Sequence, residues 1–211
     1  MAKCRELLAA FCVILGVIAL FLAAALWLYN DIEETLAAEY SEQVTQAILY
    51  HIKTTPSINN TPLVTLAPFY NSGQEIIIPE PEPTLKINET PYIGILSIPK
   101  IKTDLPVADN WNYEALRNTP CRYSGSIEDN NIVIAAHNYK KHFASIRSLS
   151  PGDLVIFTDV SGTEINYRVE ETAIVYPSEA DRVTGSGYDM TLFTCTYDET
   201  ARVVVYINRE E

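Results

Sequence analysis

The sequence of 211 residues has few cysteines, few histidines and a deficit of positive charge. Its 15 lysines and arginines face 27 aspartates and glutamates, which gives a formal net charge of −12 at pH 7. An acidic surface of this kind argues against nucleic acid or anionic lipid as a partner. No glycine-rich loop that could cradle a phosphate occurs in the sequence. Only four cysteines and three histidines are present, so a site built on these side chains has few candidate members.

Charge is missing altogether from one segment near the N-terminus. Residues 7–29 ("LLAAFCVILGVIALFLAAALWLY") contain no charged side chain over 23 positions. A helix of about 20 apolar residues is long enough to cross the hydrocarbon core of a bilayer. The sequence therefore predicts a cytoplasmic tail and a single transmembrane anchor at residues 1–29, with Trp27 and Tyr29 at the membrane interface.

The charges on either side of this segment predict its orientation. Lys3 and Arg5 precede it and an acidic stretch at residues 31–34 follows. The positive-inside rule then places the N-terminus in the cytoplasm and the remaining chain outside the plasma membrane. A cleaved secretory signal is the alternative, although its apolar region is usually shorter, about 7–15 residues. Both interpretations export the rest of the chain. The first 29 residues carry a net charge of +1, which leaves −13 for the exported part.

Residues 30–90 connect the anchor to the folded domain. Residues 31–53 are rich in good helix formers and lack proline and glycine, which predicts a helical stalk. Residues 54–90 are rich in threonine, asparagine and proline, a composition that cannot bury enough apolar surface to offset chain entropy. We interpret them as a linker. The alternative is that "LAPFY" (66–70) folds back over a groove as a lid.

From residue 91 to residue 211, short β-branched and aromatic runs alternate with turn signals. This pattern predicts a mostly β domain, a mostly antiparallel sandwich or barrel, with short helical interruptions at residues 112–118 and 142–149. The expected strands lie at residues 92–99, 103–108, 131–137, 153–159, 164–176, 190–195 and 201–209.

Two of the four cysteines lie in the exported domain, Cys121 and Cys195. They could form one disulfide in an oxidising compartment. The alternative is that one of them is kept as a free thiol for chemistry. A thiol with its ordinary pKa of about 8.5 is mostly protonated at neutral pH, so a nucleophilic cysteine needs a partner.

Three histidines could serve as that partner. His51 lies in the predicted stalk and is expected to be solvated. His142 opens the short helix of residues 142–149, where a surface or capping role is usual. His137 ends the apolar strand "NNIVIAAHNY" at its junction with a loop, where sheet proteins place reactive groups. It is the best candidate for a general acid and base, and its alternative is a satisfied edge histidine.

Arginine supplies a third candidate. If Cys195 ends one strand and Arg202 opens the next, the hairpin turn at residues 196–201 brings both to one end of the sheet. A guanidinium there could stabilise the oxyanion of a tetrahedral intermediate. The alternative is a surface arginine paired with Asp198 or Glu199. Arg209 should reach the far end of the strand and is a weaker candidate.

Four motifs in the order of the chain resemble the sortases, the membrane-anchored cysteine transpeptidases of Gram-positive-type cell envelopes. "TLFTC" (191–195) fits the TLxTC signature, "NIVIAAHN" (131–138) the strand that ends in the catalytic histidine, and "RVVVYINR" (202–209) the final strand that opens on the catalytic arginine. "YIGILSIPKIKTDLPV" (92–107) is similar to the opening strand pair. The class stays open: the turn "CTYDETAR" is similar to class B, but residues 177–189 are too short for the long helix of that class.

The resemblance implies an eight-stranded sortase-like β-barrel in which Cys195 attacks a C-terminal sorting signal of LPXTG form and becomes a thioacyl enzyme. It implies that His137 moves the protons, that Arg202 stabilises the oxyanion, and that Thr194 and Thr191 bind substrate. The acceptor would be an amine of a peptidoglycan precursor or of a pilin. Thiol chemistry of this kind disfavours the disulfide and leaves Cys121 as a packed residue.

The resemblance implies no obligatory cofactor. Calcium is bound by some sortases, but the acidic residues between 153 and 171 form no recognisable loop pattern, and we expect them to form a solvated face. Two other functions remain as alternatives. One is a surface cysteine hydrolase or peptidase that uses the same residues with water as acceptor. The other is a non-enzymatic membrane-anchored β-barrel binding module.

Overall fold

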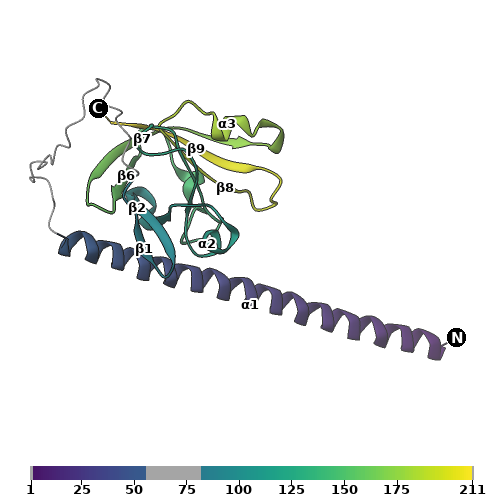
Figure 1. Ribbon diagram of the computed structural model, residues 1–211. Coiled ribbons are helices and arrows are strands. Elements are labelled where there is room, and N and C mark those ends of the chain that lie inside the picture. Colours follow the sequence, from purple (N-terminus) through teal and green to yellow (C-terminus); the bar gives the residue numbers. More distant parts are fainter. Residues whose placement is uncertain (1, 56–81, 211) are drawn as a thin grey trace, which may run out of the picture.

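The computed structural model describes residues 2–55 and 82–210, and consists of a barrel with one long helix along its side (Figure 1). The helix, α1, runs from Ala2 to Thr54. Residues 82–210 form nine strands, and eight of them close into a ring. The eight follow the order β2-β3-β4-β5-β8-β9-β7-β6, and β6 pairs with β2 to complete it. The predicted eight-stranded barrel is confirmed.

The strands of the ring are short, as the sequence pattern indicated. In chain order they are β2 (Thr90–Ile98), β3 (Thr103–Ala108), β4 (Cys121–Ser124), β5 (Ile132–Ala135), β6 (Leu154–Asp159), β7 (Glu164–Val175), β8 (Met190–Cys195) and β9 (Arg202–Arg209). The ninth strand, β1 (Leu85–Ile87), adds to the edge of β2. All seven strands expected from the sequence occur. The sequence pattern missed β4, and it missed β1 because this strand lies in the predicted linker.

Closure of the ring depends on a glycine. Gly94 of β2 pairs with Asp159 of β6. A Cβ at Gly94 would lie 2.2 Å from the carbonyl oxygen of Thr158, which is far inside van der Waals contact. Any side chain there would push β6 away from β2, so glycine is required where the two strands approach.

Short helices fill the connections between strands. They are η1 (Pro99–Ile101), α2 (Tyr113–Asn118), η2 (Ile146–Ser148), η3 (Pro177–Glu179) and α3 (Asp181–Thr184). The expected helix at 112–118 is α2, and its N-cap, Asn112, accepts a hydrogen bond from the backbone N–H of Ala115 at 2.8 Å. Of the helix expected at 142–149, the structure has only the 3₁₀ turn η2.

The barrel buries apolar residues in three places. Its interior holds the main core, which includes Leu96, Ile134, Leu192 and Val205. On the outer surface, a second cluster lies between α1 and strands β2 to β4, and a third lies beneath the segment that contains α3. Elements outside the barrel therefore cover two parts of its outer surface.

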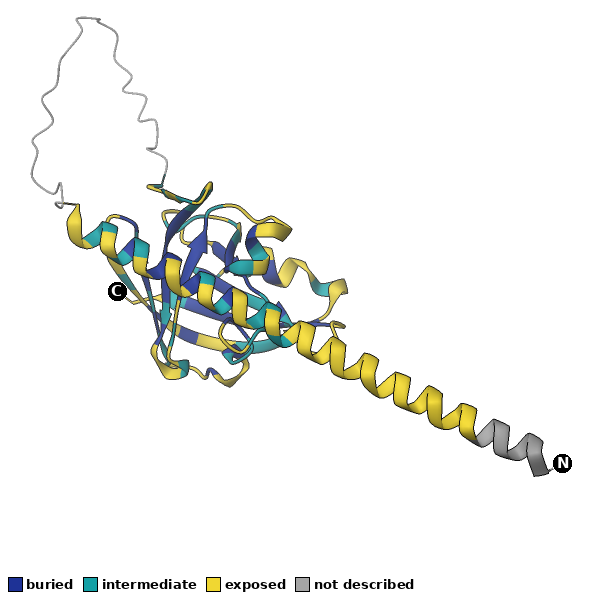
Figure 2. Ribbon diagram, turned by 90° about the horizontal axis from the view of Figure 1, so that it is seen from below, coloured by how far each residue is buried: buried dark blue, intermediate teal, exposed yellow. Residues whose placement is uncertain are grey.

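The two halves of α1 differ in burial (Figure 2). Residues 10–30 are exposed along their whole length, and this half includes an 18-residue window of mean hydropathy 2.8 with no buried residue. In the other half, Ala37, Ser41, Val44 and Ile48 are at most 3 % exposed. Their spacing of three and four residues puts them on one face of the helix. The predicted stalk is thus packed against the barrel.

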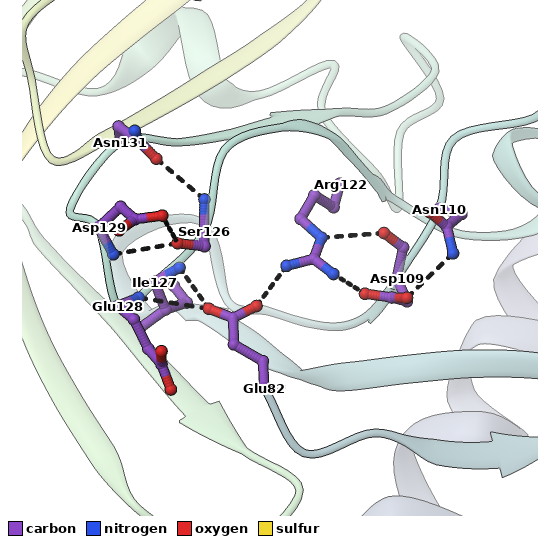
Figure 3. A network of polar contacts seen from close by, with 9 residues as sticks. All are labelled: Glu82, Asp109, Asn110, Arg122, Ser126, Ile127, Glu128, Asp129 and Asn131. Atoms are coloured by element: carbon purple, nitrogen blue, oxygen red, sulfur yellow. Dashed lines mark hydrogen bonds and ion pairs between the residues drawn. The ribbon is translucent and has the colours of Figure 1, made fainter. Parts of the chain in front are cut away.

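Glu82, the first residue of the described segment 82–210, lies in a network of charged groups on the barrel (Figure 3). The carboxylate of Glu82 pairs with the guanidinium of Arg122, and its Oε1 accepts the backbone N–H of Ile127 at 2.6 Å. Arg122 also pairs with Asp109 and donates Nε–H to the Asp109 carbonyl oxygen at 3.0 Å. These contacts fix the start of the barrel segment on β4 and on the turn that follows. The proposed lid sequence at residues 66–70 lies outside the described residues.

Candidate active site

The end of β8 and the start of β9 lie side by side. Cys195, the last residue of β8, is the Cα partner of Arg202, the first residue of β9. The connection at residues 196–201 is closed by a backbone hydrogen bond from Thr196 N–H to the carbonyl oxygen of Ala201 at 3.0 Å. Opposed residues of antiparallel strands have Cα atoms about 5 Å apart. The thiol and the guanidinium therefore start from neighbouring backbone positions.

His137 reaches the same end of the sheet from the other side of Cys195. Strand β5 runs parallel to β8, with Ala135 opposite Phe193. Contact continues beyond β5, because the backbone N–H of Ala136 donates to the Phe193 carbonyl oxygen at 3.2 Å. His137 is two residues beyond the end of β5, and extension of this parallel register brings it level with Cys195. The sequence positions 137, 195 and 202 thus form a row across three adjacent strands.

Strand alternation puts these three residues on the outer surface of the barrel. On β8, Met190 and Leu192 point into the main core, and alternate residues of a strand point to opposite faces. Phe193 belongs to the third, outer cluster, so Cys195 shares its face. On β9, Val203 lies in the main core, so its neighbour Arg202 points outward. The outer end of β5, β8 and β9 is the candidate active site.

The two predicted substrate-binding threonines are both buried, on opposite faces of β8. Thr194 is 1 % exposed, points into the barrel, and donates its hydroxyl hydrogen to the carbonyl oxygen of Ala136 at 2.8 Å. It ties β8 to the residue before His137. Thr191 is also 1 % exposed, and its hydroxyl lies 2.9 Å from that of Ser186. Their substrate-binding roles stay predictions.

The Cys195 thiol is free and half-buried. Arg202 is also half-buried, and its Nη1 donates to the carbonyl oxygen of Ala201 at 3.0 Å. Asp198 accepts hydrogen bonds from the hydroxyls of Thr196 and Thr200 instead of pairing with Arg202. In the part of the chain that the structure describes, the Arg202 guanidinium forms no ion pair. It remains available to an anionic group.

The electrostatic environment of His137 comes from several elements. Burial lowers the pKa of His137 below its ordinary value, because it disfavours the charged imidazolium. Glu33 of α1 and Glu199 of the β8–β9 turn oppose this shift, and Arg117 of α2 adds to it. The His137 ring stacks on Tyr139, with centroids 4.9 Å apart. At neutral pH most molecules therefore carry a neutral imidazole beside the thiol.

The other candidate residues occupy different sites. His142 is fully buried, not at the surface as its position in the sequence indicated, and burial lowers its pKa to about 4. Cys121 is also fully buried in the cluster under α1, and burial raises the pKa of its thiol to about 12. Both Cys121 and Cys195 are free, so the possible disulfide between them is absent. His51 lies half-exposed near the end of α1, and Arg209 ends β9, away from the site.

Sequence reasoning missed the contribution of α1 to this end of the barrel. Glu33 acts on the pKa of His137, and Glu34 contacts the loop after β5. The only sequence signal was weak: small and apolar residues recur at 37, 41, 44 and 48, a spacing that puts them on one face of a helix. Among the described residues, no group of three or more histidine, cysteine, aspartate or glutamate side chains is arranged to hold a metal ion.

Comparison with known proteins identifies relatives of this arrangement. The family model of the sortase domain matches residues 96–210, more than half of the chain. Similar solved structures include a sortase D5 transpeptidase from Clostridium perfringens (24 % identity, TM-score 0.51, covering 57 % of this chain and 79 % of that one). Another is Clostridium perfringens sortase C with the C-terminal cell wall sorting motif (25 % identity, TM-score 0.50, covering 57 % and 71 %).

A third similar structure is sortase A from Corynebacterium diphtheriae, with 22 % identity, a TM-score of 0.50 and coverage of 58 % of this chain and 62 % of that one. The chain therefore spans less than two thirds of the length of this relative. Identities of this size establish a common fold. No curated protein sequence matches the chain significantly.

Proposed function

The chain belongs to the sortase family, and on this premise we propose that it is a membrane-anchored cysteine transpeptidase that cleaves a C-terminal LPXTG-like sorting signal. The observation that carries the proposal is the row of His137, Cys195 and Arg202 across three adjacent strands. A thiol, a titratable imidazole and an unpaired guanidinium at one strand end supply a nucleophile, a proton carrier and an oxyanion partner.

In the first half-reaction, the Cys195 thiolate attacks the carbonyl carbon of the scissile amide. A C–S bond forms, and the carbonyl oxygen becomes an oxyanion that the Arg202 guanidinium stabilises. When the tetrahedral intermediate collapses, the C–N bond breaks and the His137 imidazolium gives its proton to the leaving amine. The products are a thioacyl enzyme, a neutral imidazole and the released C-terminal peptide.

In the second half-reaction, an amine of a peptidoglycan precursor or of a pilin attacks the thioester. The neutral His137 imidazole takes a proton from that amine, Arg202 again stabilises the oxyanion, and the C–S bond breaks to return the thiolate. Thiolate and imidazolium must coexist for the cycle to begin. Because burial lowers the pKa of His137, this pair is a minor population at neutral pH, and slow turnover with a bell-shaped pH profile is expected.

Thr194 supports this chemistry from inside the barrel. Its hydroxyl donates to the carbonyl oxygen of Ala136, one residue before His137. We assign it to holding the β5 end against the β8 end, which sets the separation of the imidazole and the thiol. The exposed half of α1 serves as a membrane anchor, because its apolar side chains have no protein partner within the described residues. The catalytic domain then lies on the outer side of the plasma membrane, with the N-terminus in the cytoplasm.

The test uses the full chain in detergent micelles with a library of fluorogenic LPXTG-type peptides and triglycine as the amine. The expected result is a ligated product that requires the amine, together with a Cys195 thioacyl adduct detected by mass spectrometry. Cleavage without ligation at saturating amine would instead support a cysteine hydrolase. If no peptide is cleaved, or if Cys195→Ala retains activity, the proposed function is wrong. Parallel assays with EDTA and with added calcium test whether turnover is independent of metal.

A further inference from the structure

The loop that carries His137 lies between the barrel and the packed half of α1. We call residues 137–142 the histidine loop. The backbone N–H of Lys140, in the middle of this loop, donates to the Glu34 carboxylate, and its Nζ lies 3.6 Å from the other carboxylate oxygen. The Glu34 side chain is only 19 % exposed, whereas that of Lys140 is 77 % exposed. Glu34 is therefore the less exposed partner of a contact that lies at the surface.

The end of the histidine loop is held by α1 as well. His142 Nε2 lies 3.2 Å from the Ser41 hydroxyl oxygen, and both residues are buried. The Ser41 hydroxyl also donates to the carbonyl oxygen of Asn118 at 2.7 Å. A hydroxyl has one hydrogen, so Ser41 accepts from His142, and His142 carries its proton on Nε2. This neutral tautomer joins the loop, α1 and α2 at one point.

A chain of neighbouring rings, one pair tilted and one pair stacked, connects these contacts to the imidazole of His137. The His142 and Tyr139 rings have centroids 5.5 Å apart, and the Tyr139 and His137 rings have centroids 4.9 Å apart. At the base of the loop, the Phe143 N–H donates to the His137 carbonyl oxygen at 3.2 Å. A displacement of Lys140 or His142 would therefore be passed to the His137 ring.

We propose that the packed half of α1 is a positioning element for His137, in which Glu34 and Ser41 hold the histidine loop in the geometry that the transfer reaction needs. This inference rests on the proposed function, because it takes His137 as the proton carrier. The segment next to the membrane anchor thereby becomes part of the support of the active site.

Glu34 is not needed to dock the helix. The apolar contacts of α1 begin at Ala37 and continue through Val44 and Ile48 to Ile52, whose Cγ2 would lie 2.8 Å from a Cβ at Gly162. Residues 34 and 52 are separated by about 27 Å along a helix axis. The contacts that dock α1 on the barrel therefore extend far from the histidine loop. Glu34 lies at the end of this contact surface that is nearest to the loop. Removing the Glu34 carboxylate should leave the helix docked while freeing the middle of the histidine loop.

The experiment compares three variants of the full chain in detergent micelles: Glu34→Ala, Glu34→Gln and Glu39→Ala. Glu39 is exposed on the same helix and serves as the matched control. The substrates are an LPXTG-type fluorogenic peptide that the wild-type chain cleaves and triglycine. We expect Glu34→Ala to lower kcat by about tenfold with KM within about twofold, as for a misplaced catalytic group. Glu34→Gln keeps an acceptor oxygen for the Lys140 N–H and should restore kcat, and Glu39→Ala should match the wild type.

A fourth variant, Ser41→Ala, tests the contact between Ser41 and His142. Ser41→Ala removes the acceptor for His142 Nε2–H and should also lower kcat more than KM. Its melting temperature is measured with that of Glu34→Ala, since a buried donor without a partner costs stability. Wild-type kcat in both Glu34→Ala and Ser41→Ala would overturn the inference, provided that His137→Ala is inactive. If His137→Ala retains activity, the proposed function is wrong, and the inference fails with it.

Discussion

The outer surface of the barrel has two regions that each hold one cysteine and one histidine. The covered region lies under α1 and contains Cys121 and His142, both fully buried. The open region lies at the ends of β5 and β8 and contains Cys195 and His137, both half-exposed. The residue types are the same, but the cover and the nearby charges differ.

Burial is the main reason why the covered cysteine and histidine are unsuited to catalysis. It raises the pKa of the Cys121 thiol to about 12, so almost no thiolate forms, and it lowers the pKa of His142 to about 4, so the imidazole stays neutral. In the open region, the Cys195 thiol can be reached by a substrate, and carboxylates of α1 and of the β8–β9 turn partly offset the effect of burial on the pKa of His137. Access and nearby charge therefore decide which pair is usable.

The largest expected effect is the difference in activity between alanine variants of the two cysteines. Cys195→Ala should lower peptide cleavage by on the order of 10⁴-fold or more, because it removes the nucleophile. Cys121→Ala should leave kcat unchanged and lower the melting temperature through a small cavity. Iodoacetamide labelling followed by peptide mapping should modify Cys195 and spare Cys121 in the native chain. Modification of Cys121 at a rate comparable to that of Cys195 would contradict the comparison.

The next effect concerns the arginines at the two ends of β9. Arg202→Ala should lower kcat/KM by about 10²- to 10³-fold, the usual cost of removing one oxyanion partner. Arg202→Lys should recover only part of this loss, because an ammonium cannot reproduce the planar guanidinium. Arg209→Ala, at the opposite end of the same strand, is the control and should retain activity. Equal losses in the two alanine variants would show that a general charge effect is being measured.

The open region could be predicted largely from the sequence, and the covered region could not. "TLFTC" and "RVVVYINR" are local patterns in which chain order fixes the hairpin, so Cys195 and Arg202 had to meet. The role of His137 followed from the family resemblance, whereas the parallel pairing of β5 with β8 was not predicted, because the strand pattern favoured antiparallel neighbours. The packing of α1 depends on a partner surface far away in the sequence, and its contact face includes Ala37 and Ser41, residues that an exposed stalk could equally contain.

Two short strands were hidden for related physical reasons. Strand β4 has only four residues, "CRYS", and their burial does not alternate, so no strand pattern stands out from the turns around it. Strand β1 lies in a segment with many prolines and becomes a strand only because β2 offers it an edge. The buried position of His142 was missed for the same reason as the packing of α1, since its partner is Ser41.

A moderate effect is expected on stability in the covered region. The pKa of His142 falls from an ordinary value of 6.5 to about 4 on folding, so the unfolded chain binds a proton more readily than the folded one. The stability tied to neutral His142 is fully present above about pH 6.5 and is lost as the pH falls toward 4, by at most about 3 kcal/mol.

Urea unfolding of the full chain at a series of pH values measures this slope. His142→Gln keeps an N–H donor for Ser41 but cannot titrate, and it should reduce the pH dependence between 4 and 6.5, leaving the part that His137 contributes. His51→Gln, a change at a half-exposed histidine near the end of α1, is the control and should keep the wild-type slope. A slope that His142→Gln leaves unchanged would place the acid sensitivity elsewhere.

The smallest expected effect concerns how nearby charges change the pKa of His137 in the open region. Glu33 raises the pKa of His137 and Arg117 lowers it. The acid limb of the kcat/KM profile reports the titration of His137 in the free enzyme. Glu33→Gln should therefore move this limb to lower pH, and Arg117→Gln should move it to higher pH, while the alkaline limb stays in place. The two variants change the net charge in opposite directions, so each controls for the other. Shifts in the same direction would mean that neither charge acts on His137 through space, and that the loop geometry set by α1 determines its titration.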